Sequence, residues 1–84
     1  MKLSRFAKFR AERFGGVLFD TSIEKVFALN PTAAAVIQEI KANSVDETTL
    51  IDRLRQRFND SSGTIERDIR ALIADLRQKR LIEG

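Results

Sequence analysis

The sequence of 84 residues contains no cysteine, histidine, tryptophan or tyrosine, and a single proline. Without cysteine there is no disulfide and no thiolate metal site, and without histidine the commonest general base and metal ligand is missing. No apolar run approaches the roughly 20 residues of a membrane-spanning helix, and no apolar segment follows the basic N-terminus as in a signal peptide. We therefore expect one small cytoplasmic domain, residues 1–84, without metal or cofactor.

The charges that are present are unevenly distributed. The net charge is +3, and residues 1–16 carry five basic side chains against one acid, a balance of +4. The rest of the chain is close to neutral. A basic N-terminal segment favours an acidic partner or simply keeps the protein soluble, and solubility is the simpler interpretation.

The most informative stretch runs from Phe27 to Ile37. Phe27 and Leu29 alternate with smaller side chains, which is typical of a strand. Asn30 is a suitable N-cap, and Pro31 fits the first turn of a helix. Apolar residues then recur at helical spacing, namely Ala33, Val36, Ile37 and Ile40. The chain therefore passes directly from strand into helix, and we expect this strand close to one edge of the sheet, where a further strand could be added.

Three strands followed by three helices are predicted. The strands cover 7–12, 17–19 and 25–29, with a turn at Gly15 and Gly16 and a polar turn at 20–22. The helices cover about 31–41, 46–58 and 62–79, and either Ser44 or Asp46 caps the second. Because the connections between strands are short, we predict an α+β domain in which a three-stranded antiparallel sheet precedes three helices.

The last predicted helix has two different flanks. Four apolar residues form its core stripe, namely Ile65, Ile69, Leu72 and Leu76. At about 100° per residue, Ile73 lies on one shoulder of the stripe with Arg70 and Arg77 beyond it. Asp68 and Asp75 lie on the opposite shoulder. Either Ile73 belongs to a wide core stripe and the arginines are solvated, or Ile73 and the two arginines line a groove that meets carboxylates of a bound segment.

Four segments carry a pattern that covers nearly the whole chain, from about Phe9 to Ile82. They are Gly15–Asp20, Leu29–Ile37, Ile65–Ile69 and Leu76–Ile82. The most specific is the junction of leucine, asparagine, proline and threonine at 29–32, which small and aliphatic residues follow. This pattern resembles the PqqD-like family of small peptide chaperones, also called precursor-peptide recognition elements. Arg80 stands where that family usually has glycine.

The resemblance implies a winged-helix-like fold, in which a three-stranded antiparallel sheet packs on a three-helix bundle. It implies that the leader of a ribosomally made precursor peptide binds as an added strand, paired with the third strand and lying against the third helix. It also implies a non-catalytic protein that holds the leader for a separate modifying enzyme, either a radical S-adenosylmethionine maturase or a lasso-peptide leader protease. We expect a monomer or a weak dimer that binds neither nucleic acid nor membranes. The expected leader-binding residues are Lys25, Val26, Phe27, Ala28, Leu29, Arg67, Arg70, Ile73, Ala74 and Arg77.

Other functions remain open on the sequence alone. The main alternative is a winged-helix DNA-binding regulator with the third helix as its recognition helix. Against it, residues 61–84 place four carboxylates among five basic side chains, and the strands precede the helices. A protein–protein adaptor that binds a folded partner needs the same exposed edge. An enzyme is disfavoured, because the sequence has no nucleophile motif and no phosphate-binding glycine loop.

Overall fold

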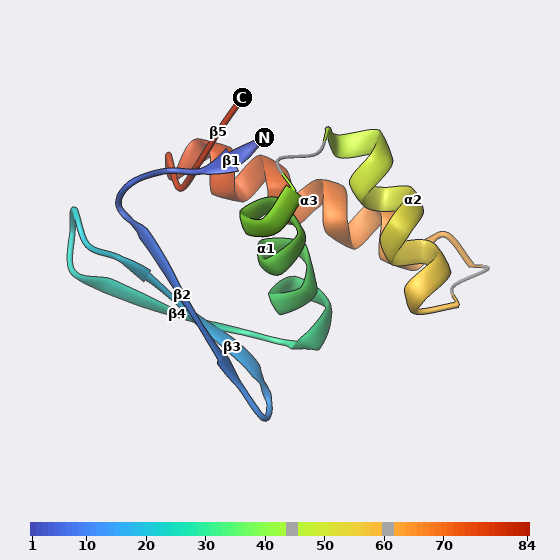
Figure 1. Ribbon diagram of the computed structural model, residues 1–84, viewed down its shortest axis with the longest axis horizontal. Helices are drawn as coiled ribbons and strands as arrows, with labels where there is room; N and C mark the ends of the chain where they lie inside the picture. The colour runs from blue at the N-terminus through green and yellow to red at the C-terminus, as the bar shows by residue number, and fades with distance from the viewer. Residues whose placement is uncertain (44–45, 60–61) are drawn as a thin grey trace.

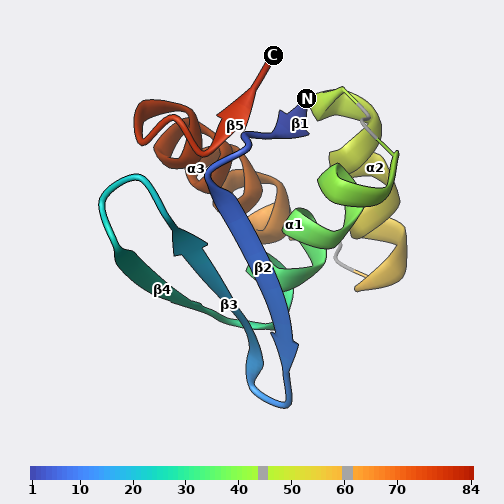
Figure 2. The ribbon, with the colours of Figure 1, turned by 60° about the vertical axis from the view of Figure 1, so that its left-hand side comes forward.

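The computed structural model describes residues 1–43, 46–59 and 62–84. Its main sheet comprises β2 (Ala7–Glu12), β3 (Gly15–Asp20) and β4 (Lys25–Leu29), antiparallel and in the order β2-β3-β4. Three helices follow, α1 (Pro31–Asn43), α2 (Glu47–Arg57) and α3 (Thr64–Gln78). Figure 1 and Figure 2 show the helices gathered on one side of this sheet. The predicted α+β order of three strands and three helices is thus confirmed.

Two short strands that the sequence did not predict lie near the two termini. β1 (Lys2–Leu3) pairs antiparallel with β5 (Ile82–Glu83), with Leu3 opposite Ile82. The Ser4 N–H donates to the Leu81 carbonyl oxygen at 2.9 Å and extends this pairing. Strands of two residues contain no alternation long enough to be recognised in a sequence, so they emerge only from the tertiary structure.

The first hairpin turns earlier than predicted. Its two-residue turn lies between Glu12 and Gly15, which pair with each other, so both glycines belong to β3 and not to the turn. A Cβ atom added at Gly15 would lie 2.2 Å from the Leu29 carbonyl oxygen, and one at Gly16 would lie 2.5 Å from the Phe9 ring. These glycines are needed because β3 packs closely against both neighbouring strands.

The hydrophobic core lies between the main sheet and the helices. Helix α1 is central, because it packs on β3 on one side and on α2 and α3 on the other. The largest fully buried side chains come from β3, the three helices and the segment after α3: Leu18, Val36, Ile37, Ile40, Leu50, Ile51, Leu54, Ile69, Ile73 and Leu81. By separating the sheet from α2, α1 leaves α3 as the helix that can flank β4.

The N-termini of α1 and α2 follow the predicted capping chemistry. The Asn30 side-chain oxygen accepts a hydrogen bond from the Ala33 N–H at 2.8 Å, so α1 begins directly after β4 as expected. For α2 the cap is Asp46, whose carboxylate accepts from the Thr49 N–H at 2.8 Å. The alternative cap, Ser44, lies outside the described residues. Hydrogen bonds from Thr49 hold the pKa of Asp46 below its ordinary value of 3.8.

Helix α3 ends in a left-handed residue that is not glycine. Arg80 has φ 60°, its N–H donates to the Arg77 carbonyl at 3.0 Å, and the Leu81 N–H donates to the Leu76 carbonyl at 2.9 Å. This pair of bonds is the Schellman arrangement, whose left-handed position favours glycine. The geometry explains why glycine is usual here in the family that the sequence resembles.

Candidate functional site

Strand β4 is an edge strand with one free side. Among the residues that the structure describes it pairs with β3 only, and it spans five residues. Phe27 is partly buried and Leu29 is buried, so both side chains face the helices, whereas Val26 is 60% exposed and Ala28 is exposed. An edge of this kind presents backbone N–H and C=O groups to which another extended chain can pair.

The register indicates which backbone groups of β4 are free. The two-residue turn places a hydrogen-bonded pair at Glu12 and Gly15, and such pairs alternate along an antiparallel ladder. Successive residues of β3 therefore form their backbone hydrogen bonds alternately with β2 and with β4. In this register the backbone N–H and C=O groups of Phe27 are bonded to β3. It follows that the backbone N–H and C=O groups of Val26 and Ala28 point outward from the free edge of β4, away from β3.

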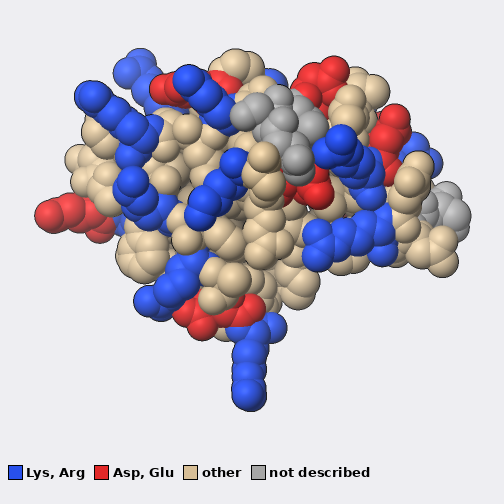
Figure 3. Space-filling model, viewed as in Figure 1, with Lys and Arg blue, Asp and Glu red and all other residues tan. Residues whose placement is uncertain are grey.

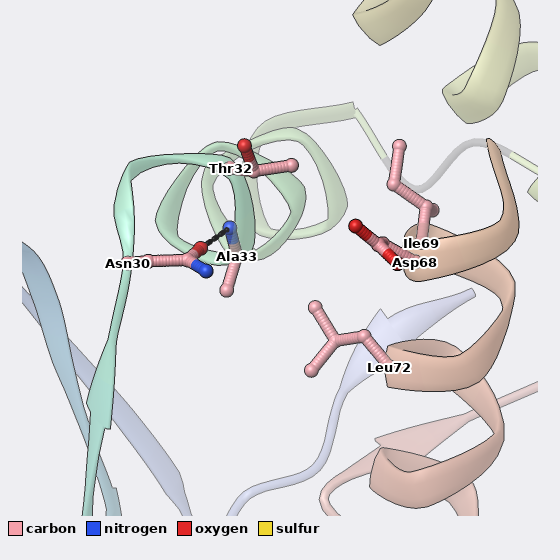
Figure 4. Close-up of a pocket in the computed structure, with 6 residues that line it drawn as sticks. All are labelled: Asn30, Thr32, Ala33, Asp68, Ile69 and Leu72. Atoms are coloured by element: carbon pink, nitrogen blue, oxygen red, sulfur yellow. Dashed lines mark hydrogen bonds between the residues drawn. The ribbon is translucent and has the colours of Figure 1, made fainter. Parts of the chain in front are cut away.

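A cavity of about 200 Å³ lies between the start of α1 and α3, next to the end of β4. Its lining residues are Asn30, Thr32, Ala33, Asp68, Ile69 and Leu72. Figure 4 shows the side chains of Asp68 and Leu72 directed from α3 toward the first turn of α1. The cavity therefore combines an apolar wall with one carboxylate.

The same flank of α3 continues along β4 toward the hairpin. The Lys79 ammonium lies 5.5 Å from the centroid of the Phe27 ring, and it forms an ion pair with Asp75 one helical turn earlier. We call this region, made of the cavity residues together with Phe27, Asp75 and Lys79, the β4–α3 surface. It offers the side of α3 that an added strand on β4 would meet.

The two arginines predicted to line a groove lie on the opposite flank of α3. Arg70 forms ion pairs with Glu47 of α2 at 2.9 Å and with Glu66 at 3.5 Å. Arg77 lies 3.7 Å from Glu47 and donates to the carbonyl oxygen of Gly84. Both guanidinium groups are therefore directed toward α2 and the C-terminal segment, away from β4.

The other predicted α3 residues lie outside the β4–α3 surface as well. Ile73 is 0% exposed and belongs to the hydrophobic core, so its interpretation as the floor of a groove does not hold and the wide core stripe does. Arg67 and Ala74 are exposed on the face of α3 turned away from the core. Of the predicted residues, only those of β4, from Lys25 to Leu29, border the surface.

The sequence prediction missed the α3 residues of this surface, among them Asp68 and Leu72. Leu72 was placed within the core stripe and Asp68 on the shoulder opposite the proposed groove. The signal that could have found them was present, because the sequence shows an acidic and a basic shoulder. The helical period alone does not determine which shoulder of α3 faces the sheet, and the location of the candidate site depends on this orientation.

Charged side chains do not gather into a basic patch on the face shown in Figure 3, where acidic groups are interspersed with Lys and Arg. Within the described ranges no group of three or more Asp and Glu residues could hold a metal ion. In the same part of the chain, no helix is long and apolar enough to cross a membrane.

A family profile described as Coenzyme PQQ synthesis protein D (PqqD) matches residues 15–82. The chain belongs to the PqqD family. The match includes β4, all of α3 and therefore the whole β4–α3 surface. No curated protein matches the chain significantly.

Two solved structures share the fold of this PqqD-family chain over nearly its full length. One is TbiB1 in complex with the TbiA(beta) leader peptide, with a TM-score of 0.83, 21% identity, and coverage of 100% of this chain and 96% of that chain. The other is a lasso peptide synthetase B1 complexed with the leader peptide, with a TM-score of 0.78, 23% identity, and coverage of 99% and 96%. The complete overlap includes β1 and β5 as well as the main sheet and helices.

Proposed function

We propose that this PqqD-family protein binds the leader segment of a ribosomally made precursor peptide as an extra strand on the free edge of β4. The observation that carries the proposal is this edge with α3 beside it. The outward backbone groups of Val26 and Ala28 supply hydrogen bonds, and the apolar wall around Leu72 receives a side chain of the added strand. Both similar solved structures are complexes with leader peptides, which supports the proposal.

The role proposed for the protein is non-catalytic. A bound leader brings the rest of its precursor to a modifying enzyme at a high effective concentration, without any chemical step on this chain. The enzyme is a radical S-adenosylmethionine maturase or a lasso-peptide leader protease. The similarity to a lasso peptide synthetase B1 favours the protease as the first partner to test.

The decisive variant is Val26→Pro. Proline removes the outward N–H of Val26, and edge strands tolerate it because that group is not bonded to the neighbouring strand. Val26→Thr is the matched control, because it keeps the β-branched shape and the N–H. With fluorescence anisotropy of the labelled leader of the short precursor encoded beside this gene, we expect Val26→Pro to weaken binding about tenfold or more and Val26→Thr to change it little.

A second probe protects the test against a folding defect. A leader peptide that is N-methylated at its central residues cannot donate to β4, and it should fail to bind the unaltered protein. If Val26→Pro remains folded by circular dichroism and binds the leader as tightly as the natural sequence, strand addition on β4 is wrong. Duplex DNA at physiological salt serves as the parallel probe, and saturable DNA binding without leader binding would favour the winged-helix regulator instead.

A further inference from the structure

The β4–α3 surface has an acidic side chain at one end and is bordered by a basic side chain at the other. At the end near α1, the exposed carboxylate of Asp68 lines the cavity beside Leu72. Figure 4 shows this carboxylate directed toward the space between the two helices, and among the residues that the structure describes it forms no ion pair. A cationic side chain entering the cavity would find an uncompensated partner there.

Lys25 borders the opposite end of the surface. It is exposed at the start of β4, and it has no ion-pair partner within the described part of the chain. Two acids lie nearby, but Asp20 is buried and accepts hydrogen bonds from Ser22, and Glu24 lies outside β4. Because Asp75 and Lys79 neutralise each other between the two ends, an added strand meets the carboxylate of Asp68 near the start of α1 and the ammonium of Lys25 near the start of β4.

We propose that this charge order selects the bound peptide: a Lys or Arg near its N-terminal end, followed about four residues later by an Asp or Glu. The inference rests on the proposed function. Every strand pair of the main sheet is antiparallel, so an antiparallel addition places the N-terminal end of the peptide beside Leu29 and Asp68. Lys25 lies four residues before Leu29, and side chains on one face of a strand recur every two residues, so a spacing of four keeps both charges facing α3.

Asp68 also lies where it can stabilise the fold. Helix α1 has no acidic residue in its first turn, and the Asp68 carboxylate lines the same cavity as Asn30, Thr32 and Ala33 at that helix start. A negative charge there interacts favourably with the helix dipole. A purely structural role would change the melting temperature, but it would not change which charges the bound peptides carry, and this difference determines the readout.

The test uses a random dodecapeptide mRNA-display library selected on the immobilised full chain. We expect peptides recovered on the natural sequence to be enriched about two- to fivefold in a cation followed four residues later by an acid, the range for exposed ion pairs. The double variant Asp68→Lys with Lys25→Glu should enrich the reversed order. The control Asp52→Lys with Lys41→Glu makes the same charge changes on exposed positions of α2 and α1, and it should keep the original order.

The outcomes separate the two proposals. If no peptides are recovered on the natural sequence, or if those recovered bind Val26→Pro equally well, the proposed function fails. Recovered peptides that require the Val26 N–H support the proposed function. If these peptides show no charge preference, if they show the reverse order, or if the double variant leaves their preference unchanged, the charge inference alone is overturned. Should the double variant fail to fold, Asp68→Asn and Lys25→Gln are read singly, and each is expected to abolish only the enrichment of its own partner charge.

Discussion

The placement of α3 is tested by altering its two flanks separately. Leu72→Ala changes the flank beside β4, and the double variant Arg70→Ala with Arg77→Ala changes the flank beside α2. We expect the first variant to weaken leader binding. The second should leave binding unchanged and lower stability, because both arginines form ion pairs with Glu47.

The expected magnitudes follow from burial. Leu72→Ala removes three carbon groups, which are worth about 0.8 kcal/mol each when fully buried, or about 2.4 kcal/mol in total. Because Leu72 is already partly buried in the free protein, we divide this between folding and binding and expect binding weaker by about 1 kcal/mol, roughly fivefold in Kd. The two arginine side chains are 48% and 45% exposed, so their ion pairs are weak. Together they are worth about 1 kcal/mol, or a Tm lower by about 4–8 °C.

The assays are anisotropy titration with the labelled leader and thermal denaturation followed by circular dichroism, on the same three proteins. The two variants are expected to differ in affinity: the leucine variant loses affinity as well as stability, and the arginine variant loses stability only. If the arginine variant loses fivefold or more in affinity while Leu72→Ala binds normally, the basic flank contacts the peptide, as the sequence alone suggested, and the assignment of the β4–α3 surface is refuted.

Two further predictions concern the helix ends. Arg80→Gly should raise the Tm by about 2–4 °C. Glycine relieves about 1–2 kcal/mol of left-handed strain, and a net stabilisation of about 0.5 kcal/mol remains after its extra backbone entropy is subtracted. Thermal melts alongside Arg80→Ala, which keeps the strain and should show no gain, check this; equal gains in both would contradict it. Since the pKa of Asp46 is lowered in the folded state, its carboxylate stabilises the protein above pH 3.8, and this contribution is lost as the pH falls through the lowered pKa. Urea denaturation of the natural sequence and Asp46→Ala should therefore show a difference at pH 7 that shrinks below pH 3.8, and a constant difference would contradict the assignment.

The parts of the fold that the sequence predicted are those that local signals determine. Asn30 and Pro31 mark the start of α1 whatever surrounds them, because a side-chain cap and a fixed φ act within a single turn. The alternation of Phe27 and Leu29 likewise fixed β4 at 25–29. The Gly-Gly turn was wrong for a complementary reason: Gly15 and Gly16 resemble turn residues, yet close packing against Leu29 and Phe9 is what requires them.

The candidate site depended on information that no local pattern contains. The amphipathic stripe of α3 was correct, but the buried centre of the helix lies at Ile69, Ile73 and Leu76, so it is rotated toward Ile73 from the expected stripe. That rotation turns Leu72 and Asp68 toward the sheet side. It depends on how α1 separates β3 from α2, which is a property of the whole packed molecule.

The same alternation that builds the core also makes the edge of β4 available. Phe27 bonds to β3 and turns its side chain toward the helices, so the intervening residues keep their backbone groups free without any loss to the fold. Backbone pairing of this kind is nearly independent of peptide sequence. In the binding mode that we propose, selectivity must therefore come from side chains beside the edge, which in this chain are Leu72, Asp68 and Lys25. On this proposal, substitutions on one flank of α3 and at the start of β4 change the preferred peptide, while the strand addition itself stays the same.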